Sequence, residues 1–181
     1  MEDQKIITGI TEDEIWSTLA PDFAVEDDML TYDVIIRQGK SDIRLYIDID
    51  PGGGFEGGSE ITQFSTVLVR DTDFRFAIHH EDFFDEVGKF FGMQDVEIGS
   101  SELDKQVVIK TNDEEKIKQI LSDPAVQAAF TTIDDFDFGI HKHLLSSEHN
   151  PVLELNINEG VTDIARLRVL YHAFYSVLNQ L

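Results

Sequence analysis

Two histidines, His141 and His143, lie two residues apart in a segment that we predict to be a β-strand. Side chains two residues apart on a strand project from the same face, so both imidazoles could bind one transition metal. A third ligand could come from His79, on the equivalent face of a strand with a similar sequence, or from His149. Two exposed histidines on a polar face explain the pattern equally well, so these residues are candidates and no metal ligand is assigned.

Acidic residues near the glycine-rich segment PGGGFEGG form a second candidate site. Asp48 and Asp50 share one strand face just before it and Glu56 lies within it, and calcium favours clustered carboxylates on a flexible loop. The EF-hand pattern does not fit, because Gly52 stands where a third oxygen ligand belongs and Ser59 where a bidentate Glu is needed. The segment also lacks the Lys and the Ser or Thr of a phosphate-binding loop. We interpret it as a long acidic hairpin loop.

The residues for other kinds of catalysis are missing or lack their usual context. The chain has no cysteine, which excludes a thiol nucleophile, a thiolate metal site and a disulfide. Ser100 and Ser101 lie outside a G-x-S-x-G motif. A catalytic pair of carboxylates cannot be singled out among so many acids. We therefore expect no cofactor and favour a protein without catalytic activity.

Charge is the most unusual property of the chain. Thirty-six Asp and Glu against 14 Lys and Arg give a net charge of −22 at pH 7. Such a charge repels nucleic acid and anionic membrane surfaces, and it attracts basic proteins or divalent ions. We therefore predict a protein partner or a second copy of the chain, and neither nucleic acid nor membrane. The alternative is that the acids serve solubility alone.

The N-terminal sequence MEDQKIITGITEDE carries acids where a signal peptide needs a basic region and an apolar run. No stretch of 18 apolar residues occurs, and the nearest approach, residues 169–178, is interrupted by His172. We therefore predict a soluble, cytoplasmic protein.

The spacing of apolar residues predicts the elements that must position these side chains. Thr11 and Glu14 have the spacing of a capping box, which should open a short helix that Pro21 and Asp22 end. Strands are predicted over residues 34–37, 43–49, 62–70 and 73–79. Apolar residues alternate with polar ones over residues 43–49, which places one face in a core and one in water.

Helices and strands interleave in the second half of the chain. A helix is predicted over residues 81–91, a second capping box at Thr111 and Glu114, and a helix that Asp123 caps and Pro124 begins. Further strands are predicted over residues 96–98, 105–110, 136–142 and 152–157, and a long helix over 162–181. The pattern indicates an α+β fold, with helices packed on a largely antiparallel sheet, a short N-terminal helix and a long C-terminal helix. We expect a single α+β domain over residues 1–181.

One internal similarity links two of these strands. The segments DFRFAIH (residues 73–79) and DFDFGIH (residues 135–141) match at five of seven positions. In both, two Phe and the Ile fall on one strand face and the terminal His on the other. A duplicated strand would explain the match, but chance is favoured because the residues that follow each segment differ.

The C-terminal helix is apolar on nearly all sides beyond Val169. Such a helix is either central to the fold or shared with a partner. In the second case it could form a homodimer. The candidate interface consists of Val169, Leu170, Tyr171, Phe174 and Leu178.

Residues 92–130 contain the string QDVEIG, the pair Leu103-Asp104, the strand QVVIKTND and the segment ILSDPAVQAAF. This string resembles an uncharacterised bacterial domain family of unknown function, with matches at Asp95, Ile98, Gly99 and Asp104. Leu103 stands where the family usually has Phe. The resemblance implies structural roles only: a turn at Gly99 and a local hydrogen bond at Asp104.

Three functional hypotheses follow from the sequence. The first is a strongly acidic, non-catalytic protein-binding domain, with a homodimer as one form. The second is an immunity-type or chaperone-type protein that binds a basic partner, for which opposite charge would speed the encounter. The third is a metal-dependent hydrolase that uses His141 and His143 with Asp135 or Asp137.

Overall fold

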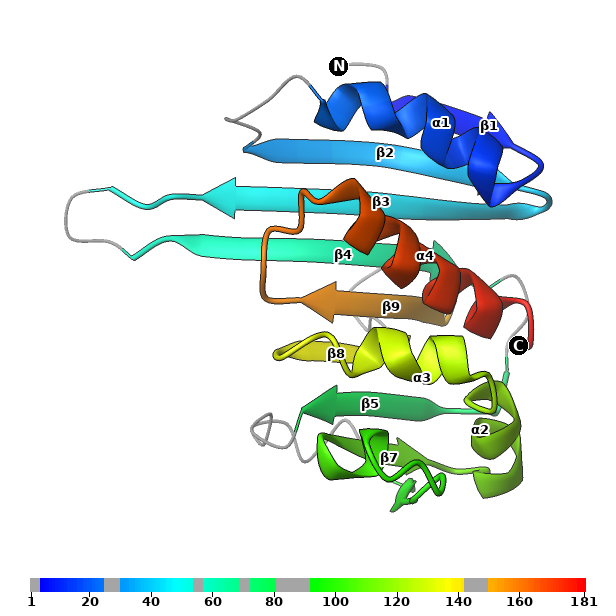
Figure 1. Ribbon diagram of the computed structural model, residues 1–181. Helices are drawn as coiled ribbons and strands as arrows, with labels where there is room; N and C mark the ends of the chain where they lie inside the picture. Colours follow the sequence, from blue (N-terminus) through cyan, green and yellow to red (C-terminus); the bar gives the residue numbers. More distant parts are fainter. Residues whose placement is uncertain (1–3, 25–29, 54–56, 69–71, 81–91, 142–149) are drawn as a thin grey trace. The chain divides into compact units, whose positions relative to one another are not determined.

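The computed structural model describes residues 4–24, 30–53, 57–68, 72–80, 92–141 and 150–181 (Figure 1). These residues contain nine β-strands, four α-helices and one short 3-10 helix. The described strand pairs are antiparallel except for one parallel pair, so the predicted α+β class is confirmed. The predicted helix over residues 81–91 lies outside the described residues.

The chain divides into two compact units. The first comprises residues 1–66 and 156–172, and the second comprises residues 67–155 and 173–181. The strand β9 (Val152–Ile157) and the helix α4 (Ile164–Leu178) each contribute residues to both units. The single domain expected from the sequence stays a prediction.

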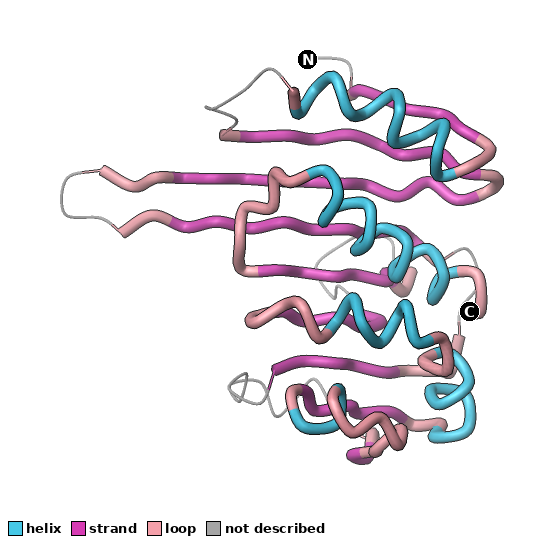
Figure 2. Tube along the Cα trace, in the orientation of Figure 1, coloured by secondary structure: helices cyan, strands magenta, loops and turns pink. Residues whose placement is uncertain are grey.

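The sheet of the first unit follows the order β1-β2-β3-β4 (Figures 1 and 2). Its strands are β1 (Lys5–Gly9), β2 (Thr31–Gln38), β3 (Ser41–Asp50) and β4 (Ser59–Val67). β1 pairs with β2 in parallel, and β2, β3 and β4 are antiparallel. Gly39 occupies the tight turn between β2 and β3 with a φ of 62°, a left-handed conformation that favours glycine.

The predicted alternation in β3 is confirmed by burial. Ile43, Leu45 and Ile47 are fully buried, whereas the residues between them are partly exposed. Above the buried face, the ring of Tyr171 contacts Trp16 edge-on at 5.6 Å between centroids and Phe64 at 6.2 Å. The first unit is therefore a sheet with one face covered by helices, as expected when one strand face is apolar.

The N-terminal helix α1 (Glu12–Phe23) begins at the predicted capping box. Its predicted end is wrong, because the helix continues through Pro21 to Phe23. A proline this close to the C-terminus removes a single backbone hydrogen bond from the helix. Contacts with β2 hold the last turn in compensation: the Tyr32 hydroxyl donates to the Asp22 carboxylate at 2.5 Å, and the rings of Phe23 and Tyr32 pack at 4.9 Å. Burial and the neighbouring carboxylate raise the pKa of the Tyr32 hydroxyl, which keeps it a donor.

The uncovered face of the same sheet carries ion pairs between adjacent strands. Arg44 on β3 donates two hydrogen bonds to Asp33 on β2, at 2.9 and 2.7 Å. Arg37 binds Asp42 in the same way, at 2.7 Å for both bonds. The Arg44 guanidinium holds the pKa of Asp33 below its ordinary value, so this carboxylate is charged throughout the neutral range.

The sheet of the second unit follows the order β9-β8-β5-β7-β6. Its further strands are β5 (Phe76–His80), β6 (Gln94–Asp95), β7 (Val107–Thr111) and β8 (Phe136–His141). A cluster of rings from β5, β8, α3 (Pro124–Phe130) and α4 forms the core on one face: Phe76, Phe130, Phe136, Phe138 and Phe174. Each of these rings is at most 1% exposed, so these five phenylalanines are packing residues.

Two short predictions in this unit are corrected. The strand predicted over residues 96–98 is β6, which ends at Asp95. The second capping box is also wrong: Asp113, and not Thr111, caps α2 (Glu114–Ile120) by accepting a hydrogen bond from the Lys116 amide at 3.0 Å. The Thr111 hydroxyl is fully buried and donates to the Arg75 carbonyl at 3.0 Å, so a contact with a neighbouring segment replaces the local cap. The predicted cap at Asp123 is confirmed.

The two similar segments noted in the sequence pair with each other. β5 and β8 are antiparallel neighbours, and Ala77 faces Gly139 at the centre of the register. A Cβ atom on Gly139 would lie 2.5 Å from the Phe76 carbonyl oxygen and 3.1 Å from the Cα of Ala77. The close approach of the two strands therefore requires glycine at position 139.

We expect Gly139→Ala to lower the free energy of unfolding by about 1–3 kcal/mol, because the added methyl overlaps backbone atoms. Chemical denaturation monitored by circular dichroism measures the change. Gly53→Ala is the matched control, because a Cβ at that position meets no atom within 4 Å. Equal effects of the two substitutions would contradict the close approach.

We expect Asp33→Asn to destabilise the protein at pH 7 by at most about 1 kcal/mol. The side chains of Arg44 and Asp33 are 41% and 35% exposed, so solvent screens the ion pair. The folded-state pKa of Asp33 lies below the unfolded-state value of about 4. The stabilisation is therefore complete above that value and is lost as pH falls through the folded-state pKa. Unfolding midpoints between pH 7 and pH 2 should converge for wild type and variant. A gap that persists at pH 2, or that Asp134→Asn reproduces, would contradict this assignment.

Candidate functional site

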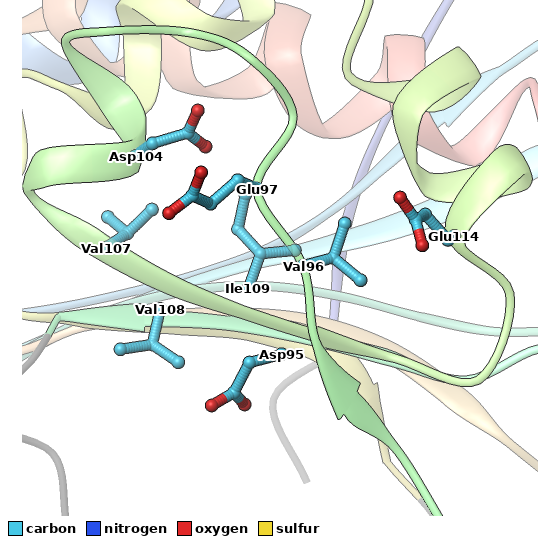
Figure 3. A pocket seen from close by; sticks show the side chains of 8 residues that line it. All are labelled: Asp95, Val96, Glu97, Asp104, Val107, Val108, Ile109 and Glu114. Atoms are coloured by element: carbon cyan, nitrogen blue, oxygen red, sulfur yellow. The ribbon is translucent and has the colours of Figure 1, made fainter.

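A cleft of about 510 Å³ lies beside β7 in the second unit (Figure 3). Among the described residues, four carboxylates and four aliphatic side chains line it: Asp95, Val96, Glu97, Asp104, Val107, Val108, Ile109 and Glu114. We call this feature the acidic cleft. The residues come from β6 and the loop after it, from the 3-10 helix Leu103–Lys105, from β7 and from the first turn of α2.

One side of the acidic cleft is a loop that Asp104 holds in place. The two oxygens of its carboxylate accept hydrogen bonds from the amides of Ile98 at 3.0 Å and Gly99 at 2.8 Å. Gly99 has a φ of +86°, a backbone conformation that is strained for any residue with a Cβ atom. The predicted turn at Gly99 and the predicted local hydrogen bond of Asp104 are both confirmed. The fully buried Leu103 anchors the other end of the loop.

Strand pairing positions the opposite part of the lining. Asp95 pairs with Lys110 in the β6–β7 register, and the Val96 amide extends the ladder by donating to the Ile109 carbonyl at 2.9 Å. Lys110 and Asp95 also form an ion pair through their side chains. This ladder fixes the direction in which the chain enters the loop, and therefore the position of Glu97.

The carboxylates of the acidic cleft differ in how far the protein already neutralises them. Asp104 is bound by backbone amides and Asp95 by Lys110. Glu114 forms an i,i+4 pair with Lys118 at 2.6 Å, and both side chains of that pair are 40% exposed or more. Such an exposed pair is weak and exchanges readily with a competing cation. Glu97 and Glu114 are thus the carboxylates best able to accept a new positive charge.

The structure brings part of the histidine candidate set together on the sheet face opposite the phenylalanine core. His141 Nε2 lies 3.0 Å from Asp137 Oδ2, and both side chains are less than 20% exposed. His79 is buried and faces Asp137 in the β5–β8 register. His143 and His149 lie outside the described residues, and Asp135 is exposed at the start of the segment.

No group of three His, Asp or Glu side chains among the described residues is arranged to hold a metal ion. Within the described residues, His141 and Asp137 form a pair, and His79 lies next to it. This arrangement supplies fewer than the three protein ligands that a catalytic zinc site uses. Metal ligation by these residues stays a hypothesis.

The hairpin reading of the glycine-rich segment agrees with the pairing of the strands on each side of it. β3 and β4 are antiparallel up to the pair Asp50 and Ser59. The carboxylate of Asp50 accepts a hydrogen bond from the Gly52 amide at 2.9 Å, and Asp48 accepts one from the Thr31 hydroxyl at 3.2 Å. Glu56 lies outside the described residues. The two described aspartates thus have local roles in the hairpin.

Burial divides the five residues of the candidate partner interface on α4. Leu170, Tyr171 and Phe174 are 0% exposed, so they are core residues and have no surface to offer a partner. Val169 is 48% exposed and Leu178 is half-buried. The helix is central to the fold, which was one of the two readings of its composition. An interface could use only Val169 and Leu178, and it stays a prediction.

Comparison of the chain with protein-family models, curated proteins and solved structures found no match. The resemblance of residues 92–130 to a bacterial domain family therefore stays a prediction. Within the described part of the chain, no helix has both the length and the apolar character needed to cross a membrane.

Sequence reasoning did not find the acidic cleft, although all eight of its described lining residues lie within residues 92–130. Thirty-six acids are spread along the chain, and spacing alone cannot show which of them converge. The signal that was available is local: Asp104 follows Gly99 at a distance that suits a carboxylate-closed turn.

We expect Asp104→Ala to lower the free energy of unfolding by about 1–2 kcal/mol, because two backbone amides lose their acceptor. Amide hydrogen exchange at Ile98 and Gly99 should become faster in the variant, as measured by NMR. Glu102→Ala, an exposed neighbour in the same loop, is the control. Unchanged exchange at both amides in Asp104→Ala would show that the carboxylate does not hold the loop.

Proposed function

We propose that this protein is a non-catalytic binding domain for a basic protein, and that the acidic cleft receives lysine or arginine side chains of that partner. The observation that carries the proposal is the composition of the cleft, whose described lining consists of four carboxylates and four aliphatic residues. Figure 3 shows the carboxylates of Glu97 and Asp104 on one side and that of Glu114 on the other, with aliphatic side chains between them.

This arrangement fits the two parts of a long basic side chain. The methylene stem of Lys or Arg covers apolar surface while its charged head stays among polar groups. In the acidic cleft, the half-buried aliphatic side chain of Val96 would contact the stem. Glu97 and Glu114 would bind the head, with Lys118 released from Glu114 in exchange.

The charge of the whole chain supports the same class of partner. Acidic residues outnumber basic ones in each of the two units, and the total reaches −22. A field of this sign attracts a basic protein before contact and raises its association rate, an effect that salt weakens. An immunity-type or chaperone-type protein is the sharper form of this proposal, since both would mask a cationic partner.

A metal-dependent hydrolase is the second candidate, and the contact between His141 and Asp137 favours it. The discriminating measurement is the metal content of the purified protein with and without His141→Ala. Stoichiometric metal that disappears in the variant would favour the hydrolase over the binding domain.

The test of the acidic cleft uses octalysine as the probe and calorimetric titration at low and high salt. We expect Glu97→Gln combined with Glu114→Gln to weaken binding about tenfold, which corresponds to about 1.4 kcal/mol for two lost charge contacts. Glu102→Gln combined with Glu115→Gln removes the same charge from exposed positions that do not line the cleft.

We expect the control pair to weaken octalysine binding by less than about threefold, because exposed charges outside a contact act only through a screened field. Equal losses in the two double variants would show that octalysine binds the surface charge in general. No binding to the wild type at low salt would overturn the proposed function.

A further inference from the structure

The strand β1 forms one end of the strand order in the first unit and pairs on one side only, with β2. Within the described residues no strand pairs with its other side, so the peptide groups that point outward are a template for a further strand. We propose that this edge is a second binding site, separate from the acidic cleft, and that it accepts an extended segment of a basic protein as an added β-strand.

The edge of β1 lacks the features that usually prevent strand addition. Natural edges are protected by shortness, by proline, by bulges or by charged side chains. All five residues of β1 pair one-to-one with β2, without a bulge, and the sequence KIITG contains no proline. Its one charged residue, Lys5, forms an ion pair with Asp22 on α1.

The edge strand of the second unit shows the contrast within the same chain. β6 has only two residues, and its Asp95 carries a charge beside Lys110. The chain leaves the ladder after Val96 and enters the loop of the acidic cleft. Shortness protects that edge, whereas β1 pairs over five residues and presents a longer edge.

Apolar side chains are exposed along β1. Ile6 is 51% exposed and Ile10, which directly follows the strand, is 84% exposed. An added strand would cover the Ile6 side chain with a neighbour of its own, which is the contact that stabilises cross-strand pairs. Isoleucine and threonine at three of the five positions also favour the extended conformation that strand addition needs.

The edge is held rigidly, so little conformational entropy is lost when a partner binds. Gly9 packs so closely against α1 that a Cβ would lie 2.7 Å from Ile15 Cγ1. The Glu14 carboxylate accepts a hydrogen bond from the Ile10 amide at 2.8 Å and thereby fixes the exit of the strand.

The negative charge near β1 favours a basic segment as the added strand. The first turn of α1 follows the strand directly and carries Glu12, Asp13 and Glu14. Asp13 forms an ion pair with Arg168, and its side chain is still 80% exposed. A second copy of the chain would bring another −22 to the contact, whereas a segment with lysines would be attracted. The edge therefore fits a strand with apolar and basic residues in alternation.

The test uses an eight-residue peptide in which valine and lysine alternate, with amide hydrogen exchange of the full-length protein as the readout. We expect the peptide to slow exchange within Lys5–Gly9 at least about tenfold, because outward amides gain acceptors. The same peptide with alternate amides N-methylated cannot form the ladder, and it should leave exchange in β1 unchanged.

Ile6→Lys adds to this edge a charge that has no ion-pair partner there, and we expect it to weaken peptide binding at least about tenfold. Val169→Lys is the matched control, because Val169 has nearly the same exposure, 48% against 51%, and the charge change is identical. Thr8→Lys, at a second exposed position of β1, provides an independent variant if Ile6→Lys fails to fold.

The outcomes separate this site from the acidic cleft. Equal binding of the N-methylated peptide, without protection of β1, would overturn the edge site and leave the proposed function standing. A wild-type dimer that Ile6→Lys converts to a monomer in sedimentation would show that the edge binds a second copy instead. Protection of β1 that persists in the Glu97→Gln, Glu114→Gln double variant would support two separate sites. If neither the valine–lysine peptide nor octalysine binds the wild type, both proposals are overturned.

Discussion

The hydroxyl of Tyr171 donates a buried hydrogen bond to the side-chain oxygen of Gln38 at 2.7 Å. The two residues are 133 positions apart in the sequence, and Tyr171 is fully buried. Because a buried polar group without a partner costs about 1–3 kcal/mol, this bond restricts where α4 can lie on the sheet of the first unit. Trp16 on α1 and Phe64 on β4 pack on the same ring, so the positions of both helices depend on one side chain.

The acidic residues of this protein have two different kinds of role. Many are used within the fold: Asp113 and Asp123 cap helices, Asp104 closes a loop and Asp33 binds Arg44. Each of these carboxylates accepts hydrogen bonds from backbone amides or from a basic side chain. Other acids keep the field of the protein negative, and Glu97 and Glu114 of the acidic cleft are the ones best able to accept a new positive charge. Net charge alone therefore overstates how many acids are available to a partner.

Local signals in the sequence predicted elements well where the local and tertiary preferences agree. The cap at Asp123 and the alternation of β3 were each predicted from a few neighbouring residues. The predictions failed where a distant contact decided the outcome. Contacts of Asp22 with Lys5 on β1 and Tyr32 on β2 allow α1 to continue beyond Pro21. The Thr111 hydroxyl donates a hydrogen bond to the Arg75 carbonyl instead of capping α2. Helix and turn propensities are a few tenths to about one kcal/mol per residue, so one tertiary hydrogen bond can reverse them.

The sequence by itself determined the fold class, the position of most strands and the sign of the charge, because periodicity and composition are properties of neighbouring residues or of simple sums. It also showed that β5 and β8 resemble each other. Only the tertiary structure decided that these strands pair, that Tyr171 and Phe174 are core residues, and that four of the 36 acids meet in one cleft. The strand order that places β1 at one end was likewise beyond the sequence. The physical reason is that strand order and side-chain convergence depend on which distant segments pack together, and spacing along the chain carries no record of that choice.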